Sequence, residues 1–290
     1  MTNRWVLGAR LRTLPAAVVP VIVGTAAAVG EPNGGIVWWR MLAAMVVALS
    51  IQIATNYVND YADGVRGTDD RRVGPTRLVA SGLATAREVK RAAGIAALVA
   101  AVAGIGLAIA VGPEVLVVGV ACFAAGYFYT GGPKPYGYLG LGEVFVFVFF
   151  GLVATVGSSY VQLDRLTTLA FGAAVPVGLL ATALLVVNNL RDIPTDARSG
   201  KRTLAVRLGD SATRALYVAL VIGAFAIVPL VALRRPWALV ALVALAVASR
   251  PLRRIADGTS GMGLIAVLGE TARLQLAFGA LLALGLAVSG

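Results

Sequence analysis

The chain has 290 residues, of which 59% are apolar and only 13% are charged, and its mean hydropathy is +0.85. A soluble domain is about half apolar and a quarter charged, so this composition excludes both a soluble single-core protein and a disordered chain. One cysteine and no histidine exclude an intrachain disulfide, a cysteine-rich metal cluster and histidine-based catalysis. Any metal must therefore bind oxygen ligands, which favours Mg²⁺ or Mn²⁺.

Nine apolar stretches are long enough, or nearly long enough, to cross a bilayer core, which takes about 20 residues. In chain order they are 14–29, 38–56, 92–111, 115–129, 144–160, 166–187, 213–233, 237–248 and 271–288. The fourth and the eighth are the shortest. We therefore predict an all-α integral membrane protein, a bundle of about nine transmembrane helices with a cytoplasmic polar cap. Residues 1–290 form a single polytopic domain in this prediction.

The basic residues orient the predicted helices. With the N-terminus in the cytoplasm, 21 of the 25 Lys and Arg residues fall in inner segments and four in outer segments. This distribution follows the positive-inside rule for an odd number of helices. It predicts a multi-pass protein of the cell membrane with its C-terminus outside. The topology also accounts for most of the net charge of +11, so we expect no nucleic-acid partner.

Two similar acidic clusters follow the second and the sixth predicted helix. Their members are Asn56, Asp60 and Asp63 in the first cluster and Asn188, Asp192 and Asp196 in the second. If the helices continue this far, each trio lies on one helical face. The repeated Asn-x3-Asp spacing favours an internal duplication, with approximate halves 1–140 and 141–290, and brings both clusters to the cytoplasmic surface.

Carboxylates gathered on one helical face repel one another unless a cation lies between them. Mg²⁺ is typically held by one or two carboxylates together with phosphate oxygens and water. We therefore predict a magnesium site, with two ions, at Asp60, Asp63, Asp192 and Asp196. Asp69 is a further candidate ligand, although its neighbours Arg71 and Arg72 favour local ion pairing instead.

Basic residues next to the acidic clusters predict that the metal holds a diphosphate. Arg66 follows the first cluster, while Lys201 and Arg202 follow the second. Lys134 is the only basic residue in its loop, after Tyr129. Lys and Arg beside metal-binding acids are typical of phosphate sites, whereas anchoring to lipid headgroups is the alternative for any single arginine.

These residues resemble the UbiA superfamily of intramembrane aromatic prenyltransferases. The resemblance rests on the acidic clusters and on five runs that are most similar to enzymes acting on 1,4-dihydroxy-2-naphthoate. The runs are RTLP at 12–15, the stretch 56–82 with RGTDD and RLVASG, the stretch 130–150, the stretch 188–209 with GKRTLAVRLG, and TARLQL at 271–276. The first cluster departs from the common family pattern Asp-x3-Asp, which leaves open whether Asp63 or Asp69 is its second ligand.

The resemblance implies that a long-chain polyprenyl diphosphate ionises and that the allylic cation attacks the carboxylate-bearing carbon of 1,4-dihydroxy-2-naphthoate. Carbon dioxide is lost and demethylmenaquinol forms, a step of menaquinone biosynthesis. The resemblance implies diphosphate binding by Arg12, Arg66, Lys201 and Arg202. On the same basis Lys134, Tyr129, Asn56 and Asn188 are candidate catalytic residues. The aromatic residues Tyr127, Tyr129, Phe145, Phe147, Phe149 and Phe150 are candidates to face the cation, or else simple packing residues.

Three alternatives remain open at this point. The acceptor could be 4-hydroxybenzoate, homogentisate or haem. A membrane transporter would also have duplicated halves, but its charges would lie nearer the midplane. A CDP-alcohol phosphotransferase would explain Asp60-x2-Asp63-Gly64 and Arg66, although it would leave the second acidic cluster without a role.

Overall fold

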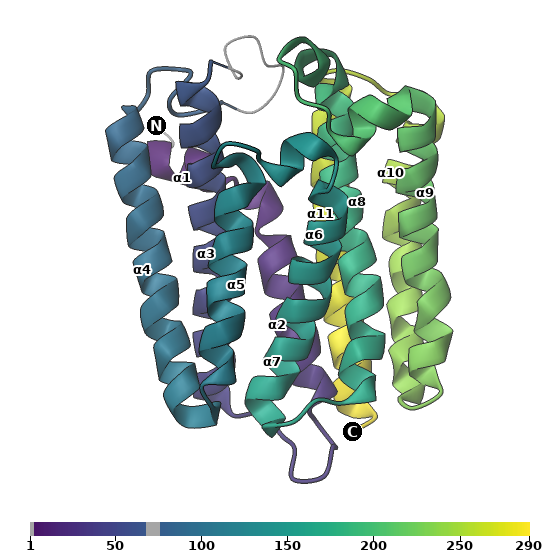
Figure 1. Cartoon of the computed structure of the whole chain (residues 1–290). Coiled ribbons are helices and arrows are strands. Elements are labelled where there is room, and N and C mark those ends of the chain that lie inside the picture. Colours follow the sequence, from purple (N-terminus) through teal and green to yellow (C-terminus); the bar gives the residue numbers. More distant parts are fainter. Residues whose placement is uncertain (1–2, 68–75) are drawn as a thin grey trace.

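The computed structural model describes residues 3–67 and 76–290, and this part of the chain contains helices and no strand (Figure 1). The helices before the middle of the chain are α1 Arg4–Ala9, η1 Leu11–Thr13, α2 Pro15–Ala27, α3 Trp38–Val65, α4 Ala86–Val111, α5 Glu114–Thr130 and η2 Tyr136–Leu139. Those that follow are α6 Gly142–Val146, η3 Phe147–Val153, α7 Ala154–Leu163, α8 Thr168–Arg198, α9 Leu204–Ala232, η4 Pro236–Ala244, α10 Leu245–Ala256 and α11 Gly263–Val288.

The long helices run side by side as one bundle, with the two termini at opposite ends (Figure 1). The C-terminal ends of α3 and α8 lie at the same end as the N-terminal helix α1, together with η2 and the α8–α9 connection. We call this the polar end of the bundle, and the opposite end the far end. Both acidic clusters therefore lie at the same end, as the sequence predicts.

Six helices in the described ranges are long and apolar enough to cross a membrane. They are α3, α4, the continuous stretch Gly142–Leu163, α8, α9 and α11. A seventh crossing is formed if Arg4–Thr13 and Pro15–Ala27, which meet at a bend of 53°, make one broken span. The predicted fourth span corresponds to α5, which has 17 residues, and the predicted eighth to η4 and α10. The multi-pass membrane architecture is thus confirmed, with six or seven spans by these criteria, and the number nine stays a prediction.

The packed core lies around α8 and α11. We compare the most apolar stretch of 18 residues in each long helix. In α8 72% of this stretch is buried and in α11 56%, whereas in α4 only 17% is buried. The largest buried cluster joins these two helices to α2, α9, η4 and α10. Outward-facing residues such as Ile109 and Leu233 are more than 80% exposed, as expected for side chains whose solvent is lipid.

The packing is looser around α5. This helix packs against α3, α4 and η2, and its contact with the stretch α6–η3–α7 is slight at most. The opposite side of that stretch packs closely against α8. A Cβ atom at Gly151 would lie only 2.5 Å from the Cα of Gly178, so the two backbones can approach this closely only because residue 151 is glycine. The segment η3 is a π-helical turn, a feature common near functional sites. The space between α5 and this stretch belongs to a large cavity.

Candidate active site

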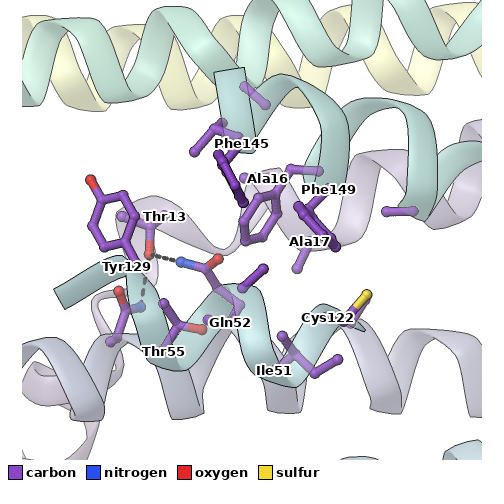
Figure 2. Close-up of a pocket in the computed structure, with 18 of the residues that line it drawn as sticks. Thr13, Ala16, Ala17, Ile51, Gln52, Thr55, Cys122, Tyr129, Phe145 and Phe149 are labelled. Carbon is purple, nitrogen blue, oxygen red and sulfur yellow. Dashed lines mark hydrogen bonds between the residues drawn. The ribbon is translucent and has the colours of Figure 1, made fainter. Parts of the chain in front are cut away.

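A cavity of about 1560 Å³ extends from the polar end into the apolar interior. Its walls come from η1, α2, α3, α4, α5, the stretch α6–η3–α7 and α8. Ala16 and Ala17 on α2 face Ile51 on α3 and Cys122 on α5 in its apolar part (Figure 2). The polar part contains Asp63, Asp192 and Asp196. The cavity therefore combines a charged end with a long apolar compartment.

Four aromatic rings line one wall of the cavity. Tyr129 meets Tyr136 edge-on with centroids 5.5 Å apart, Tyr136 stacks on Phe145 at 3.9 Å, and Phe145 stacks on Phe149 at 5.9 Å. Figure 2 shows Tyr129, Phe145 and Phe149 among the side chains that line the cavity. Of the other aromatic candidates, Phe150 also lines the cavity, whereas Tyr127 is 53% exposed on the outside of α5.

Phe147 has a packing role. A Cβ at Gly178 would come within 2.8 Å of the Phe147 ring, which places this ring against α8 and outside the cavity lining. The aromatic wall can stabilise a carbocation through the negative faces of its rings. Four of the six aromatic candidates named from the sequence therefore belong to the site.

On the α8 side, the second acidic cluster faces the cavity as a group. Asn188, Asp192 and Asp196 all line it, together with Arg191. The Arg191 guanidinium donates to both carboxylate oxygens of Asp192, at 2.7 and 2.8 Å, and to Oδ1 of Asn188 at 2.8 Å. Both Arg191 and Asp192 are almost fully buried. The two hydrogen bonds between the guanidinium and the carboxylate offset the cost of removing both charges from water.

On the α3 side, Asp63 is the carboxylate that lines the cavity. The Lys201 ammonium donates to its Oδ1 at 3.0 Å, and the Tyr138 hydroxyl donates to the same oxygen. The Lys201 ammonium also lies 4.7 Å from the Tyr138 ring centroid. Burial alone would lower the pKa of Lys201, but the charge and hydrogen bond of Asp63, together with the nearby Tyr138 and Asp196, outweigh burial and raise this pKa, so Lys201 stays protonated.

Lys201 reaches Asp63 because of a turn at the end of α8. Gly200 has a φ of +77°, a left-handed conformation that other residues rarely adopt, and the backbone amide of Lys201 then donates to the carbonyl of Asp196 at 2.9 Å. Burial and the neighbouring Asp63 raise the pKa of Tyr138, so its hydroxyl stays a donor. The turn thus joins the two acidic clusters through one buried cation.

Asp60 and Asn56 hold the backbone near the site. Asp60 is fully buried, and its carboxylate accepts hydrogen bonds from the backbone amides of Leu78 and Val79 at 2.8 and 3.0 Å. The Asn56 amide donates to the carbonyl of Ala9 at 2.9 Å and to the Thr13 hydroxyl. Asn56 lines the cavity, whereas Asp60 does not. Both residues therefore attach neighbouring chain segments to α3.

The basic residues predicted to bind diphosphate divide into two groups. Lys201 and Arg12 line the cavity. Arg66 donates to the carbonyls of Thr130 and Gly132 and so ties the end of α3 to the end of α5. Arg202 and Lys134 are exposed and lie outside the cavity lining. The structure therefore brings two of these five cations directly to the site.

Comparison with known proteins adds to this geometry. The profile of the UbiA prenyltransferase family matches residues 17–260. The chain belongs to the UbiA prenyltransferase family. It is 49% identical to the 1,4-dihydroxy-2-naphthoate octaprenyltransferase of Mycobacterium tuberculosis over 94% of this chain and 93% of that protein. It is 39% identical to the protein of the same name from Escherichia coli, over 77% of this chain and 74% of that protein.

Solved structures of the UbiA family share the fold. A UbiA homologue from Archaeoglobus fulgidus, bound to GPP and Mg²⁺, superposes with a TM-score of 0.64, covering 97% of this chain and 99% of that chain at 12% identity. This level of identity supports the shared architecture only. The protein is therefore a multi-pass membrane transferase of the UbiA family, as its resemblance predicts.

The oxygen donors of this UbiA-family chain suit magnesium. Within residues 3–67 and 76–290, no three carboxylates lie close enough together to form a metal cluster by themselves. Asp63, Asp192 and Asp196 nevertheless line one cavity that also contains Lys201. Mg²⁺ needs only one or two carboxylates when phosphate oxygens and water complete its shell, so the donor set fits this ion. Asp69 lies outside the described residues.

Three residues of the site, Tyr136, Tyr138 and Arg191, are not identified from the sequence. Arg191 is counted there only as one of many inner cations, although an arginine within an apolar helix end beside an aspartate is a signal of its own. Tyr138 carries no comparable signal, since a tyrosine in a Gly-rich loop is common. The structure brings it to Asp63 because η2 folds back over the end of α3.

Proposed function

We propose that this protein transfers a polyprenyl group from its diphosphate to 1,4-dihydroxy-2-naphthoate with loss of carbon dioxide, giving demethylmenaquinol in menaquinone biosynthesis. The observation that carries the proposal is one cavity with acidic and basic residues at the polar end and an aromatic wall leading into an apolar interior. The names of the relatives, at up to 49% identity, support the choice of acceptor.

The polar end holds the diphosphate in this proposal. Lys201 and Arg12 supply positive charge within the cavity. Asp63, Asp192 and Asp196 would hold Mg²⁺, with two ions and Asp69 as a further ligand in the fullest form of the site. The ion, when bound, would neutralise charge on the departing diphosphate. Arg66 and Arg202 contribute to the positive field at the same end rather than through a direct contact.

Ionisation of the allylic C–O bond leaves the electron pair on the diphosphate and a cation on the prenyl carbon. The rings of Tyr129, Tyr136 and Phe145 lie along the wall where this cation forms, and their faces stabilise it. The apolar residues beyond them accommodate the prenyl tail and keep water from the cation. The slight contact between α5 and α6–η3–α7 leaves this part of the cavity bounded loosely on one side.

Loss of the carboxylate completes the reaction without a strong base. The prenyl carbon bonds to the ring carbon that bears the carboxylate, the C–CO2 bond breaks, and its electron pair returns to the ring. No ring proton has to be removed, which suits a chain with no histidine. Tyr129, Asn56 and Asn188 line the space in which the acceptor would lie.

Purified protein incubated with farnesyl diphosphate, Mg²⁺ and a panel of acceptors tests this proposal. We expect 1,4-dihydroxy-2-naphthoate to be preferred over 4-hydroxybenzoate and homogentisate, and EDTA to abolish turnover until Mg²⁺ is restored. Acceptor labelled with ¹³C in the carboxyl group should give an unlabelled product. A prenylated product that keeps the label, or a preference for 4-hydroxybenzoate, would contradict the naphthoate assignment.

We further propose nine membrane crossings, with the N-terminus and the active site in the cytoplasm and the C-terminus outside. The excess of Lys and Arg at the polar end supports this orientation. In a cysteine-free background, Ser199→Cys at the polar end should resist a membrane-impermeant thiol reagent applied to intact cells. Asp164→Cys at the far end should react, and the opposite pattern would reverse the topology.

A further inference from the structure

Arg191 carries an unused hydrogen-bond donor inside the site. Its Nε and Nη2 are committed to Asp192 and Asn188, but Nη1 has no hydrogen-bond partner among the residues that the structure describes. The side chain is 1% exposed, so this donor is shielded from bulk solvent. An unpaired donor on a buried charged group is costly, so its presence beside a cavity points to a functional role such as binding a ligand.

The position of the guanidinium indicates which ligand group this is. Helix α8 runs from the far end towards the polar end, and its side chains lean back towards its N-terminus. The bond from Arg191 to Asn188, one turn earlier, therefore places the guanidinium on the interior side of Asp192. Lys201 and Asp196 lie on the other side, at the polar end. An anionic group that reaches Arg191 thus lies deeper than the diphosphate.

We propose that Arg191 recognises the acceptor and that its Nη1 binds the carboxylate of the aromatic substrate. This inference rests on the proposed function, because it names the residue that recognises the acceptor in that reaction. Asp192 and Asn188 fix the guanidinium before the substrate arrives, so little side-chain freedom is lost on binding. Arg191 belongs to the cavity wall, so a ligand in the cavity lies next to this side chain.

The same contact allows the site to distinguish the acceptor, which has a carboxylate, from the product, which has lost it. The acceptor enters with a carboxylate that pairs with Nη1, and this group leaves as carbon dioxide when the C–C bond forms. The prenylated product then has no anion for Arg191, while the guanidinium keeps its bonds to Asp192. Arg191 therefore increases the affinity for the acid without increasing the affinity for the decarboxylated product.

The test compares two ligands that differ only in the carboxylate. Binding of 1-hydroxy-2-naphthoate and of 1-naphthol to the detergent-purified protein is measured by their fluorescence, in the wild type, Arg191→Gln and Arg191→Lys. We expect Arg191→Gln to weaken binding of the acid about 10- to 100-fold, as loss of a charge-assisted bond implies. Binding of 1-naphthol should change less than about threefold. The ratio of the two affinities removes any general effect of disturbing Asp192.

Arg191→Lys keeps the charge but loses the planar donor geometry, so it should restore only part of the preference for the acid. Arg250→Gln, on the exposed side of α10, is the matched control and should leave the ratio unchanged. An unchanged ratio in Arg191→Gln would overturn the proposal, as would an increase in the KM of farnesyl diphosphate without a change in the ratio. Failure of the wild type to prenylate any naphthoate would instead overturn the proposed function, because the binding measurement needs no turnover.

Discussion

The C-terminal ends of α3 and α8 carry the same Asn-x3-Asp pattern but use it differently. On α8, Asn188, Asp192 and Asp196 all line the cavity. On α3, Asp60 is turned to the backbone of residues 78 and 79, and Asn56 is bonded to the N-terminal segment. Only the third member of that cluster, Asp63, is an acid that faces the cavity.

The difference arises from what packs over each helix end. The segment α1–η1 and the chain at 76–79 both fold against α3, and their backbone polar groups need partners there. The corresponding face of α8 lines the cavity instead, so its acidic side chains lie where a ligand can reach them. The two similar helix ends therefore have different roles. The end of α3 holds the neighbouring segments of the polar end together, and the end of α8 supplies most of the acidic groups that line the cavity.

The largest expected effect is that of Asp192→Asn. The substitution keeps the side-chain volume but removes a negative charge that faces the cavity, so turnover should fall about 1000-fold, the loss typical of several kcal/mol of transition-state stabilisation. Steady-state prenyl transfer from farnesyl diphosphate measures it, and the thermal unfolding midpoint in detergent checks that the variant is folded. Activity within tenfold of wild type would remove Asp192 from the site.

The next largest effect distinguishes Lys201 from Lys134, both of which the sequence predicts to be site residues. Lys201→Met removes the buried cation between the clusters and leaves Asp63 without its ammonium partner, so kcat/KM should fall about 100-fold. Lys134→Met should lower it by less than about threefold, because this side chain is exposed and outside the cavity lining. Equal losses in the two variants would mean that the loop at residue 134 closes over the substrate.

Much of this architecture could be predicted from the sequence, because hydropathy and the distribution of basic residues directly reflect the bilayer. Every predicted span falls on a helix, and both acidic clusters lie at one end of the bundle. The roles within each cluster could not be predicted, since they depend on non-local contacts. Nothing near Asp60 in the sequence indicates that Leu78 and Val79 direct their amides at it, or that Tyr138 and Lys201 meet at Asp63.

Asp60→Asn should affect stability more than chemistry. The amide retains one acceptor oxygen for the two backbone donors and turns an N–H towards the other, which should cost about 2–3 kcal/mol of unfolding free energy. Residual activity per folded molecule should stay within about tenfold of wild type. Thermal unfolding and activity of Asp60→Asn and Asp192→Asn, measured together, decide whether Asp60 supports the fold or binds the metal. A stable but inactive Asp60→Asn would restore Asp60 as a metal ligand.

The smallest effects are expected for the two asparagines. Substitution of Asn56 should affect mainly stability, whereas substitution of Asn188 should affect mainly activity. Asn56→Ala leaves the Ala9 carbonyl without this donor and the Thr13 hydroxyl with Gln52 as its remaining donor, so it should lower the unfolding free energy by about 1–2 kcal/mol and loosen the N-terminal segment. Asn188→Ala removes only one acceptor for Arg191 at the cavity wall, so it should cost less than about 1 kcal/mol but lower kcat/KM by a few fold. Limited proteolysis near Arg10 reports the first effect and acceptor KM the second. If both variants lost activity equally at unchanged stability, α3 and α8 would share one chemical role after all, and the division of work between them would be wrong.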